Sequence, residues 1–336
     1  MANVFLNPEK YLPTALALLQ REIKGAGLFV HKFGQADYSG AEGDTVMIKR
    51  PPVLVARDAG FRSRNTPLVV DSIIQSRIAV KLTKHPYSRV GLSPEEATLD
   101  QVSYVRDVQA PQVRAMVEDF DDSIAAALAD ATFVHEVDFK EGATGKTGDP
   151  RKVAIAGKAK LDSSNVPSAG RFWLVGASVS AAVAAYDKLL DVDTAGIPEA
   201  LRDGVVGRLA GFTVIDWPAL DDNESYFVHN TAVALSTVAP VVPNGAAAGG
   251  SLAAKGLAVT QVWSYGDDQL QDRSTVHAFT GATPIEDPKI LDADKLDTTE
   301  TTVLQRKGEI ELDDGEPVMQ FVRAVKVNFT PEASGE

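Results

Sequence analysis

The chain has 336 residues, enough for one large domain or two smaller ones with a sizeable core. It contains no cysteine, which excludes disulfide bonds, thiolate metal sites and cysteine nucleophiles. Its net charge of −13 argues against a protein that grips nucleic acid through the phosphates, and no apolar run is long enough for a membrane span.

Charge is divided unevenly along the first part of the chain. Residues 44–90 contain nine basic and three acidic side chains, a net charge of +6. Residues 91–138 contain two basic and eleven acidic side chains, a net charge of −9. A basic block beside an acidic block is therefore the main electrostatic feature of the sequence.

The basic block is predicted to form a long two-stranded arm. Residues 45–49 are rich in β-forming side chains, and Pro51 and Pro52 end this strand. From Ile74 to Thr83 the side chains alternate in character, as in a strand with one buried face. The polar stretch 57–66 between the strands suits a mobile tip. Because an isolated hairpin is only marginally stable, we expect this arm to lie against another surface.

The acidic block is predicted to be helical. Residues 93–96 carry a helix-start signature, and Pro111 is expected to separate a short helix near 100–109 from a long one near 111–131. An apolar stripe with three- and four-residue spacing follows the long helix and consists of Val113, Val117, Phe120, Ile124 and Leu128. The opposite side is acidic and contains Glu118, Asp119, Asp121 and Asp122.

The remainder of the chain is predicted to be a mixed α+β segment. Strands are expected at 172–175, 212–215, 226–228, 276–279 and 319–329, and helices at 178–190 and 231–238. Residues 244–256 are small and are expected to form a loop or linker. The stretch 284–316 is polar and acidic and is expected to contain an additional strand at 309–312.

Two segments resemble catalytic or phosphate-binding motifs but are incomplete. Gly145-Lys146-Thr147 resembles the end of a phosphate-binding loop, yet Lys140 stands where that loop needs its first glycine. Residues 176–180 nearly match a nucleophile elbow, but Ser180 replaces its second glycine. Ser178 is better explained as a helix N-cap.

No metal site is predicted. Residues 191–196 begin like a calcium-binding loop but lack the later ligands. The five histidines show no helical zinc-pair spacing and are expected to be surface or satisfied core residues: His31, His85, His135, His229 and His277. We therefore expect no catalytic residue, no cofactor and no metal. An enzyme with a carboxylate site and a monomeric binding module with a basic arm remain open alternatives.

Several segments, in order, resemble the tailed-bacteriophage major capsid (coat) protein family with the Hong Kong-phage capsid fold. Residues 43–52 (GDTVMIKRPP) resemble the approach to its extended loop, and residues 92–100 (LSPEEATLD) the approach to its spine helix. Further resemblances, to the axial domain and the return strand, lie at 167–175, 207–212, 217–220, 229–232 and 273–282. The resemblance spans nearly the whole chain.

The resemblance implies an α+β phage major capsid fold with five parts. These are an N-terminal arm (1–42), an extended β-hairpin loop (43–90), a peripheral domain with a long spine helix (91–149), an axial domain (150–270), and return strands of the peripheral domain (271–336) that include the insertion near 284–316.

The resemblance also implies a function. We expect a non-enzymatic capsid protein that forms pentamers and hexamers of an icosahedral phage head, encloses double-stranded DNA without sequence-specific binding, and takes part in head maturation. Assembly is expected in the bacterial host cytoplasm. Besides itself, the expected partners are a separate scaffolding protein, a portal protein and a decoration protein. A shell protein of an encapsulin-type nanocompartment is the alternative.

In this fold the extended loop reaches over a neighbouring subunit, so the charge asymmetry predicts how it docks. The expected contact residues of the loop are Lys49, Arg50, Arg57, Arg62, Arg64, Arg77 and Lys81. The expected docking surface on the neighbour is acidic and consists of Glu118, Asp119, Asp121 and Asp122.

Overall fold

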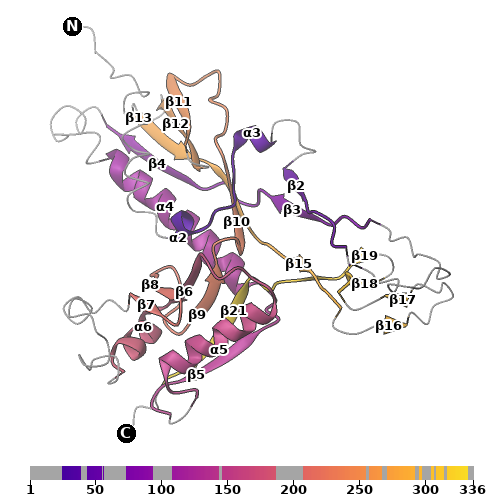
Figure 1. Cartoon of the computed structure of the whole chain (residues 1–336). Coiled ribbons are helices and arrows are strands. Elements are labelled where there is room, and N and C mark those ends of the chain that lie inside the picture. Colours follow the sequence, from indigo (N-terminus) through magenta and orange to yellow (C-terminus); the bar gives the residue numbers. More distant parts are fainter. Residues whose placement is uncertain are drawn as a thin grey trace.

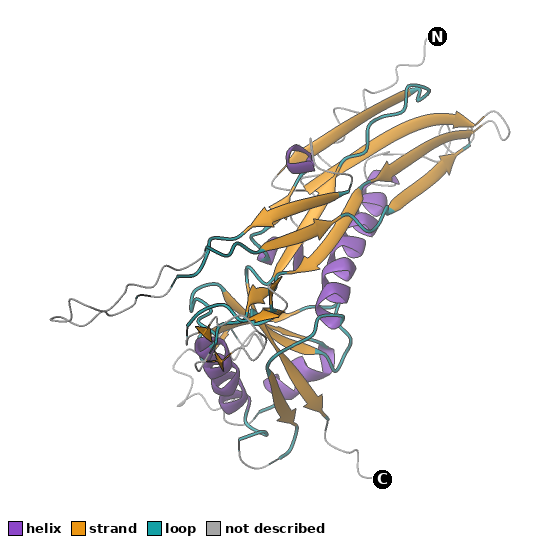
Figure 2. Ribbon diagram, turned by 90° about the vertical axis from the view of Figure 1, so that its right-hand side faces the viewer, coloured by secondary structure: helices purple, strands orange, loops and turns teal. Residues whose placement is uncertain are grey.

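The structure is a computed structural model of the chain. It describes residues 25–38, 44–54, 56, 73–93, 108–143, 146–186, 207–254, 257–266, 271–291, 295–296, 304–305, 308–313 and 316–331. The molecule is elongated, with a sheet at each end, the long helix α4 (Ala110–Ala129) beside the upper sheet, and a hairpin that projects sideways (Figures 1 and 2). None of the described helices is long and apolar enough to cross a membrane.

The long helix confirms the sequence prediction. Helix α4 has Pro111 in its first turn, where the missing amide hydrogen costs nothing. Its buried face includes Phe120, Ile124 and Leu128, which are fully buried and pack with Trp217 in one core cluster. The side chain of Val117 and most of the short helix expected near 100–109 lie outside the described residues.

A six-stranded sheet forms one end of the molecule. Its strand order is β5 (Glu136–Lys140), β21 (Ala324–Thr330), β9 (Ser225–His229), β6 (Arg171–Val175), β8 (Phe212–Asp216) and β7 (Arg208–Leu209). Three of these strands confirm the predictions at 172–175, 212–215 and 226–228. Helices α5 (Pro150–Ser163) and α6 (Ala177–Ala184) pack on the sheet through a cluster centred on Trp173, Phe212 and Phe227. Strand β21 pairs in parallel with β5, so the end of the chain completes this sheet.

Two further sheets form the other end. The larger has the order β11 (Ala248–Ala254), β12 (Leu257–Gly266), β13 (Gln271–His277) and β4 (Tyr87–Leu92), and α4 contacts β4 and β13. The smaller has the order β1 (Lys32–Phe33), β10 (Val233–Val238) and β14 (Phe279–Pro284). The short helices α2 (Gly25–Leu28) and α3 (Gln35–Tyr38) precede and follow β1.

Three local predictions are wrong. A helix was expected at 231–238, but residues 233–238 form strand β10, because both edges of this largely buried run are paired with other strands. Residues 244–256 contain strand β11 instead of only a loop, and its small side chains serve packing, since a Cβ at Gly249 would lie 2.5 Å from Val242. Gly176, and not Ser178, is the N-cap of α6.

The acidic stretch 284–316 contains several short paired strands. They are β15 (Asp287–Pro288), β16 (Lys295–Leu296), β17 (Leu304–Gln305), β18 (Leu312–Asp313) and β19 (Glu316–Pro317). Strand β15 pairs with β20 (Met319–Gln320), so the strand predicted at 319–329 is divided into β20 and β21. The strand predicted at 276–279 is likewise divided, at Ala278, between β13 and β14.

Candidate intersubunit surface

The sideways hairpin consists of β2 (Thr45–Lys49) and β3 (Arg77–Lys81), and it has one buried and one exposed face. Val46 pairs with Val80 and Ile48 with Ile78 on the buried face, which packs against Ala234 and Ile285. This arrangement confirms the alternation expected from Ile74 to Thr83. The buried face therefore fixes the base of the arm to the body of its own subunit.

The exposed face of the hairpin is apolar at its centre and basic at both ends. Met47 pairs with Ala79, and 52% of its surface is exposed. Lys49 lies directly opposite Arg77, and Lys81 follows on the same face. Like charges directly opposite on a sheet are unfavourable. The pair Lys49 and Arg77 thus weakens the isolated hairpin slightly and favours contact with an acidic surface.

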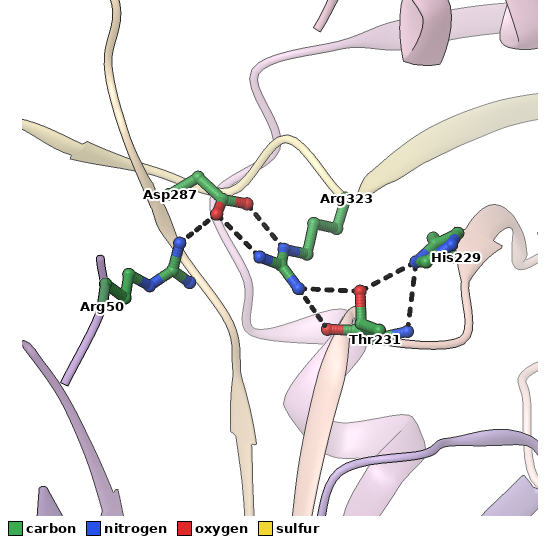
Figure 3. A network of polar contacts seen from close by, with 5 residues as sticks. All are labelled: Arg50, His229, Thr231, Asp287 and Arg323. Carbon is green, nitrogen blue, oxygen red and sulfur yellow. Dashed lines mark hydrogen bonds and ion pairs between the residues drawn. The ribbon is translucent and has the colours of Figure 1, made fainter. Parts of the chain in front are cut away.

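A charged cluster anchors the chain immediately after β2 (Figure 3). Arg50 forms an ion pair with Asp287 of β15, and Arg323 donates two hydrogen bonds to the same carboxylate, at 2.6 and 2.8 Å. Burial alone would raise the pKa of Asp287, but the hydrogen bonds and charges of Arg323 and Arg50 outweigh burial and hold that pKa below its usual value. Asp287 therefore stays ionised and joins the end of β2, the start of the acidic stretch 284–316 and the residue before β21.

The same cluster continues to a buried histidine, His229 (Figure 3). Arg323 donates to Thr231 Oγ1 at 2.7 Å, and this hydroxyl is 2.8 Å from His229 Nδ1. His229 Nε2 is 2.9 Å from the carbonyl oxygen of Ala169, which can only accept, so Nε2 carries the proton. Nδ1 then accepts from Thr231. Burial, followed by the charge of Arg323, lowers the pKa of His229, which keeps it neutral in this arrangement.

Comparison with solved structures identifies the fold. A chain from a structure of Mycobacterium phage Che8 matches with a TM-score of 0.60 and 16% identity over 91% of both chains. A chain of the capsid of the cyanophage P-SCSP1u matches with a TM-score of 0.58 and 11% identity over 90% of this chain and 88% of that one. This chain has the phage major capsid fold.

A third capsid chain, from the mature capsid of bacteriophage PhiM1, has a TM-score of 0.52 with 11% identity over 86% of this chain and 82% of that one. No protein-family model and no curated protein sequence matches this chain. The likeness to capsid chains is therefore detected from the arrangement of the backbone and not from the sequence, because only 11–16% of the aligned residues are identical.

The predicted cations of the capsid fold's extended loop differ in what they contact. Lys49 and Arg77 are exposed, and Lys81 is 3.8 Å from the exposed carboxylate of Asp44. Arg50 is largely buried and is already paired with Asp287 inside its own subunit. Three further predicted contact residues, Arg57, Arg62 and Arg64, lie outside the described residues.

The predicted acidic surface of α4 also divides into two kinds of side chain. Glu118 and Asp122 are exposed, one helical turn apart, and Glu118 accepts a hydrogen bond from Arg114 at 3.0 Å. Asp121 accepts a hydrogen bond from Trp217 Nε1 at 3.3 Å. Asp119 is half-buried, and burial raises its pKa, although the charge of Lys84 acts in the opposite direction. Glu118 and Asp122 are therefore the accessible part of this surface.

Two groups of contacting side chains are not apparent from the sequence. The cluster around Asp287 joins residues far apart in the chain, and His85 Nε2 lies 3.0 Å from His277 Nδ1. The histidines were each expected to be surface or satisfied core residues, and 192 residues separate this pair in the chain. Of the incomplete phosphate-loop motif, Gly145 lies outside the described residues, and the carbonyl oxygen of Thr147 accepts a hydrogen bond from the backbone amide of Lys140 at 2.9 Å. The incomplete calcium-loop motif at 191–196 lies outside the described residues.

Proposed function

We propose that the chain is a phage major capsid protein that assembles with copies of itself into pentamers and hexamers of an icosahedral shell around double-stranded DNA. The observation that carries the proposal is the hairpin, whose exposed face presents Met47 between cations and lies on no part of the subunit that the structure describes. The phage capsid fold supports the same conclusion. The role is that of a structural protein of the virion, and not of an enzyme.

The proposed contact places the exposed hairpin face on α4 of the next subunit. Lys49, Arg77 and Lys81 would face Glu118 and Asp122 of that neighbour, with Met47 adding apolar area. Each exposed ion pair contributes about 0–1 kcal/mol and is screened by salt, so the charges mainly orient the contact. Durable association comes from apolar area, of which obligate interfaces bury about 2,000 Å² or more in total.

The other expectations derived from the family fit this proposal. We assign residues 43–90 to the extended loop, 91–149 with the later return strands to the peripheral domain, and 150–270 to the axial domain. A separate scaffolding protein, a portal protein and a decoration protein are the proposed partners, and the bacterial cytoplasm is the proposed site of assembly and head maturation.

The test is the size of the purified full-length protein. Sizing chromatography followed by negative-stain microscopy should give closed shells or ring-shaped capsomers. A protein that remains a monomer at high concentration, with the exposed face of the hairpin covered by its own subunit in an experimental structure, would end the proposal. Nucleic acid recovered from particles isolated from phage-infected cells would separate a phage head from a shell that encloses protein.

A further inference from the structure

Strand β11 forms one edge of the four-stranded sheet and pairs with β12 over its whole length of seven residues. Only β12 makes extensive contact with it among the described elements, whereas α4 contacts β4 and β13. Most residues of β11 are glycine or alanine, which are weak strand formers, so this strand depends on its pairing. The outer edge of β11 has no partner strand in the part of the chain that the structure describes.

The other edges of the two large sheets have features that normally prevent pairing with another chain. Strand β4 carries the exposed charge of Arg89, and the carbonyl oxygen of Ser88 accepts a hydrogen bond from Gln112 Nε2 at 3.1 Å. In the six-stranded sheet, β5 carries the exposed carboxylates of Glu136 and Asp138, and β7 has only two residues. Strand β11 contains no charged residue and no proline, and its register with β12 is continuous over all seven residues. It is therefore the edge best suited to receive a further strand.

We propose that the outer edge of β11 pairs with β11 of a second copy of this chain, antiparallel and about a twofold axis at Ser251. Centring the contact on Ser251 keeps all seven residues of both strands paired, with Gly249 opposite Ala253 of the second copy. An antiparallel pair of this length forms about six to eight backbone hydrogen bonds. The two four-stranded sheets would then continue into one another across the axis.

The chemistry of β11 favours an identical strand as its partner. Because β11 is uncharged, two copies bring no like charges together. One face of the strand is already covered within the subunit, since Ser251 Oγ lies 2.8 Å from Thr260 Oγ1. A Cβ at Gly249 would likewise lie 2.5 Å from the side chain of Val242. The edge, and not this face, is therefore the part of β11 that remains open to a partner.

A twofold contact uses the same surface on both copies, and twofold symmetry is the commonest in protein assemblies. Pairing of two short edges buries less than the about 1,200–2,000 Å² of a stable interface. We therefore expect it to act together with the other contacts of the shell. Its location, between neighbouring pentamers and hexamers, rests on the proposed function.

The chain contains no cysteine, so single cysteines in the full-length protein can test the pairing. Opposite residues of an antiparallel pair have Cα atoms about 4.5–5.5 Å apart, within the about 4.4–6.8 Å that a disulfide needs. We expect oxidation to link Ser251→Cys to its own copy and to shift most chains to the dimer band of a non-reducing gel. Ala253→Cys is the matched control and should stay monomeric, because it lies on the same face of the strand with its Cα about 14 Å from its copy.

Electron microscopy of the same samples separates this contact from the shell itself. Shells in which Ser251→Cys stays monomeric, or crosslinks no better than Ala253→Cys, would overturn the pairing and leave the proposed function standing. A crosslinked dimer in a protein that forms no shell would support the pairing and contradict the proposed function. Absence of both the crosslink and the shell would contradict both.

A second variant keeps the pairing testable if Ser251→Cys does not fold. Ala253→Lys adds a lysine of the kind that protects natural edge strands, so the yield of shells should fall. The urea midpoint should stay unchanged, because Ala253 is exposed in the subunit. Ala156→Lys places the same charge on the exposed side of α5 and should assemble like the wild type. Equal yields for the two lysine variants would overturn the pairing, as would a different strand on the β11 edge in an experimental structure of the shell.

Discussion

Arg50 forms an ion pair with Asp287, although 237 residues separate them in the chain. Arg50 follows the first strand of the hairpin, and Asp287 lies at the start of the acidic stretch between β14 and β20. Arg323 binds the same carboxylate with two hydrogen bonds. This shared carboxylate fixes where the arm leaves the body, and therefore the direction in which its exposed face points.

Replacing the shared carboxylate should destabilise the subunit. Asp287→Asn leaves two largely buried guanidinium groups without their counterion, so we expect the free energy of unfolding to fall by about 2–4 kcal/mol in urea denaturation. Asp44→Asn is the matched control, because the ion pair of Asp44 with Lys81 is exposed and contributes about 0.5 kcal/mol or less. Similar losses for the two variants would contradict this role of Asp287.

The stability of the subunit should fall as the pH drops below 6.5. The pKa of His229 is lowered in the folded protein, mainly by burial, from the ordinary value of 6.5. The unfolded chain therefore binds more protons below this pH, and the stabilisation that is complete above 6.5 is lost as the pH falls through the folded pKa. His31, His135 and His277 are shifted in the same direction, again chiefly by burial.

Denaturation at pH 7.5 and pH 5.5 measures this dependence, with a lower midpoint expected at pH 5.5. His229→Gln preserves a donor towards Ala169 and an acceptor towards Thr231 but does not titrate. The difference between the two pH values should therefore be smaller for His229→Gln than for the wild type. An identical difference would show that His229 does not contribute.

Reversing two exposed charges of the hairpin should impair assembly without affecting the subunit itself. Arg77→Glu with Lys81→Glu should lower the yield of shells at low ionic strength, and the difference from wild type should shrink as salt screens the charges. Lys152→Glu with Lys158→Glu makes the same charge change on the exposed side of α5 and is the control. Equal yields for the hairpin variant and the wild type at every salt concentration would discard the electrostatic contribution.

The apolar centre of the exposed face can be tested separately. Met47→Ser should change the free energy of unfolding by about 0.5 kcal/mol or less, because Met47 is half-exposed in the subunit. The contact would bury the exposed half of Met47, which contributes about 0.8–1.5 kcal/mol, so the protein concentration needed for assembly should rise about four- to twelvefold.

The opposite face of the hairpin provides the contrast to Met47→Ser. Ile78→Ala removes a buried side chain and should lower the free energy of unfolding by about 2–5 kcal/mol. Light scattering as a function of protein concentration, together with urea denaturation of both variants, separates loss of contact from loss of fold. Unchanged assembly of Met47→Ser would show that the exposed face of the hairpin is not part of the interface.

A glycine inside α5 should tolerate no larger residue. Gly157→Ala would normally stabilise a helix by about 1 kcal/mol. Here the added Cβ would lie 2.5 Å from Cδ2 of Phe227, which is fully buried, and overpacking of this kind costs about 1–3 kcal/mol. We expect net destabilisation in thermal unfolding, whereas Ala156→Gly at the neighbouring exposed position should cost about 1 kcal/mol from helix propensity alone. Stabilisation by Gly157→Ala would contradict the packing seen here.

The sequence by itself determined the elements whose periodicity is strong. The stripe from Val113 to Leu128 was sufficient for α4, and the alternation around Ile78 and Val80 was sufficient for the two faces of the hairpin. In both cases the spacing of apolar side chains matches the repeat of a helix or a strand. This repeat is a property of the local backbone and does not depend on which residues pack against the element.

Only the tertiary structure decided the rest. The run at 233–238 (VALSTV) is too short to show whether its apolar side chains follow a helical or a strand repeat, and its pairing with β1 and β14 makes it a strand. Likewise, Arg50, an expected contact residue of the loop, forms an ion pair with Asp287 within its own subunit, and His277 lies beside His85. These contacts join residues separated by 192 and 237 positions, so no local pattern in the sequence predicts them. They form because the packing of the whole fold offsets the conformational entropy that is lost when the two distant segments are brought together.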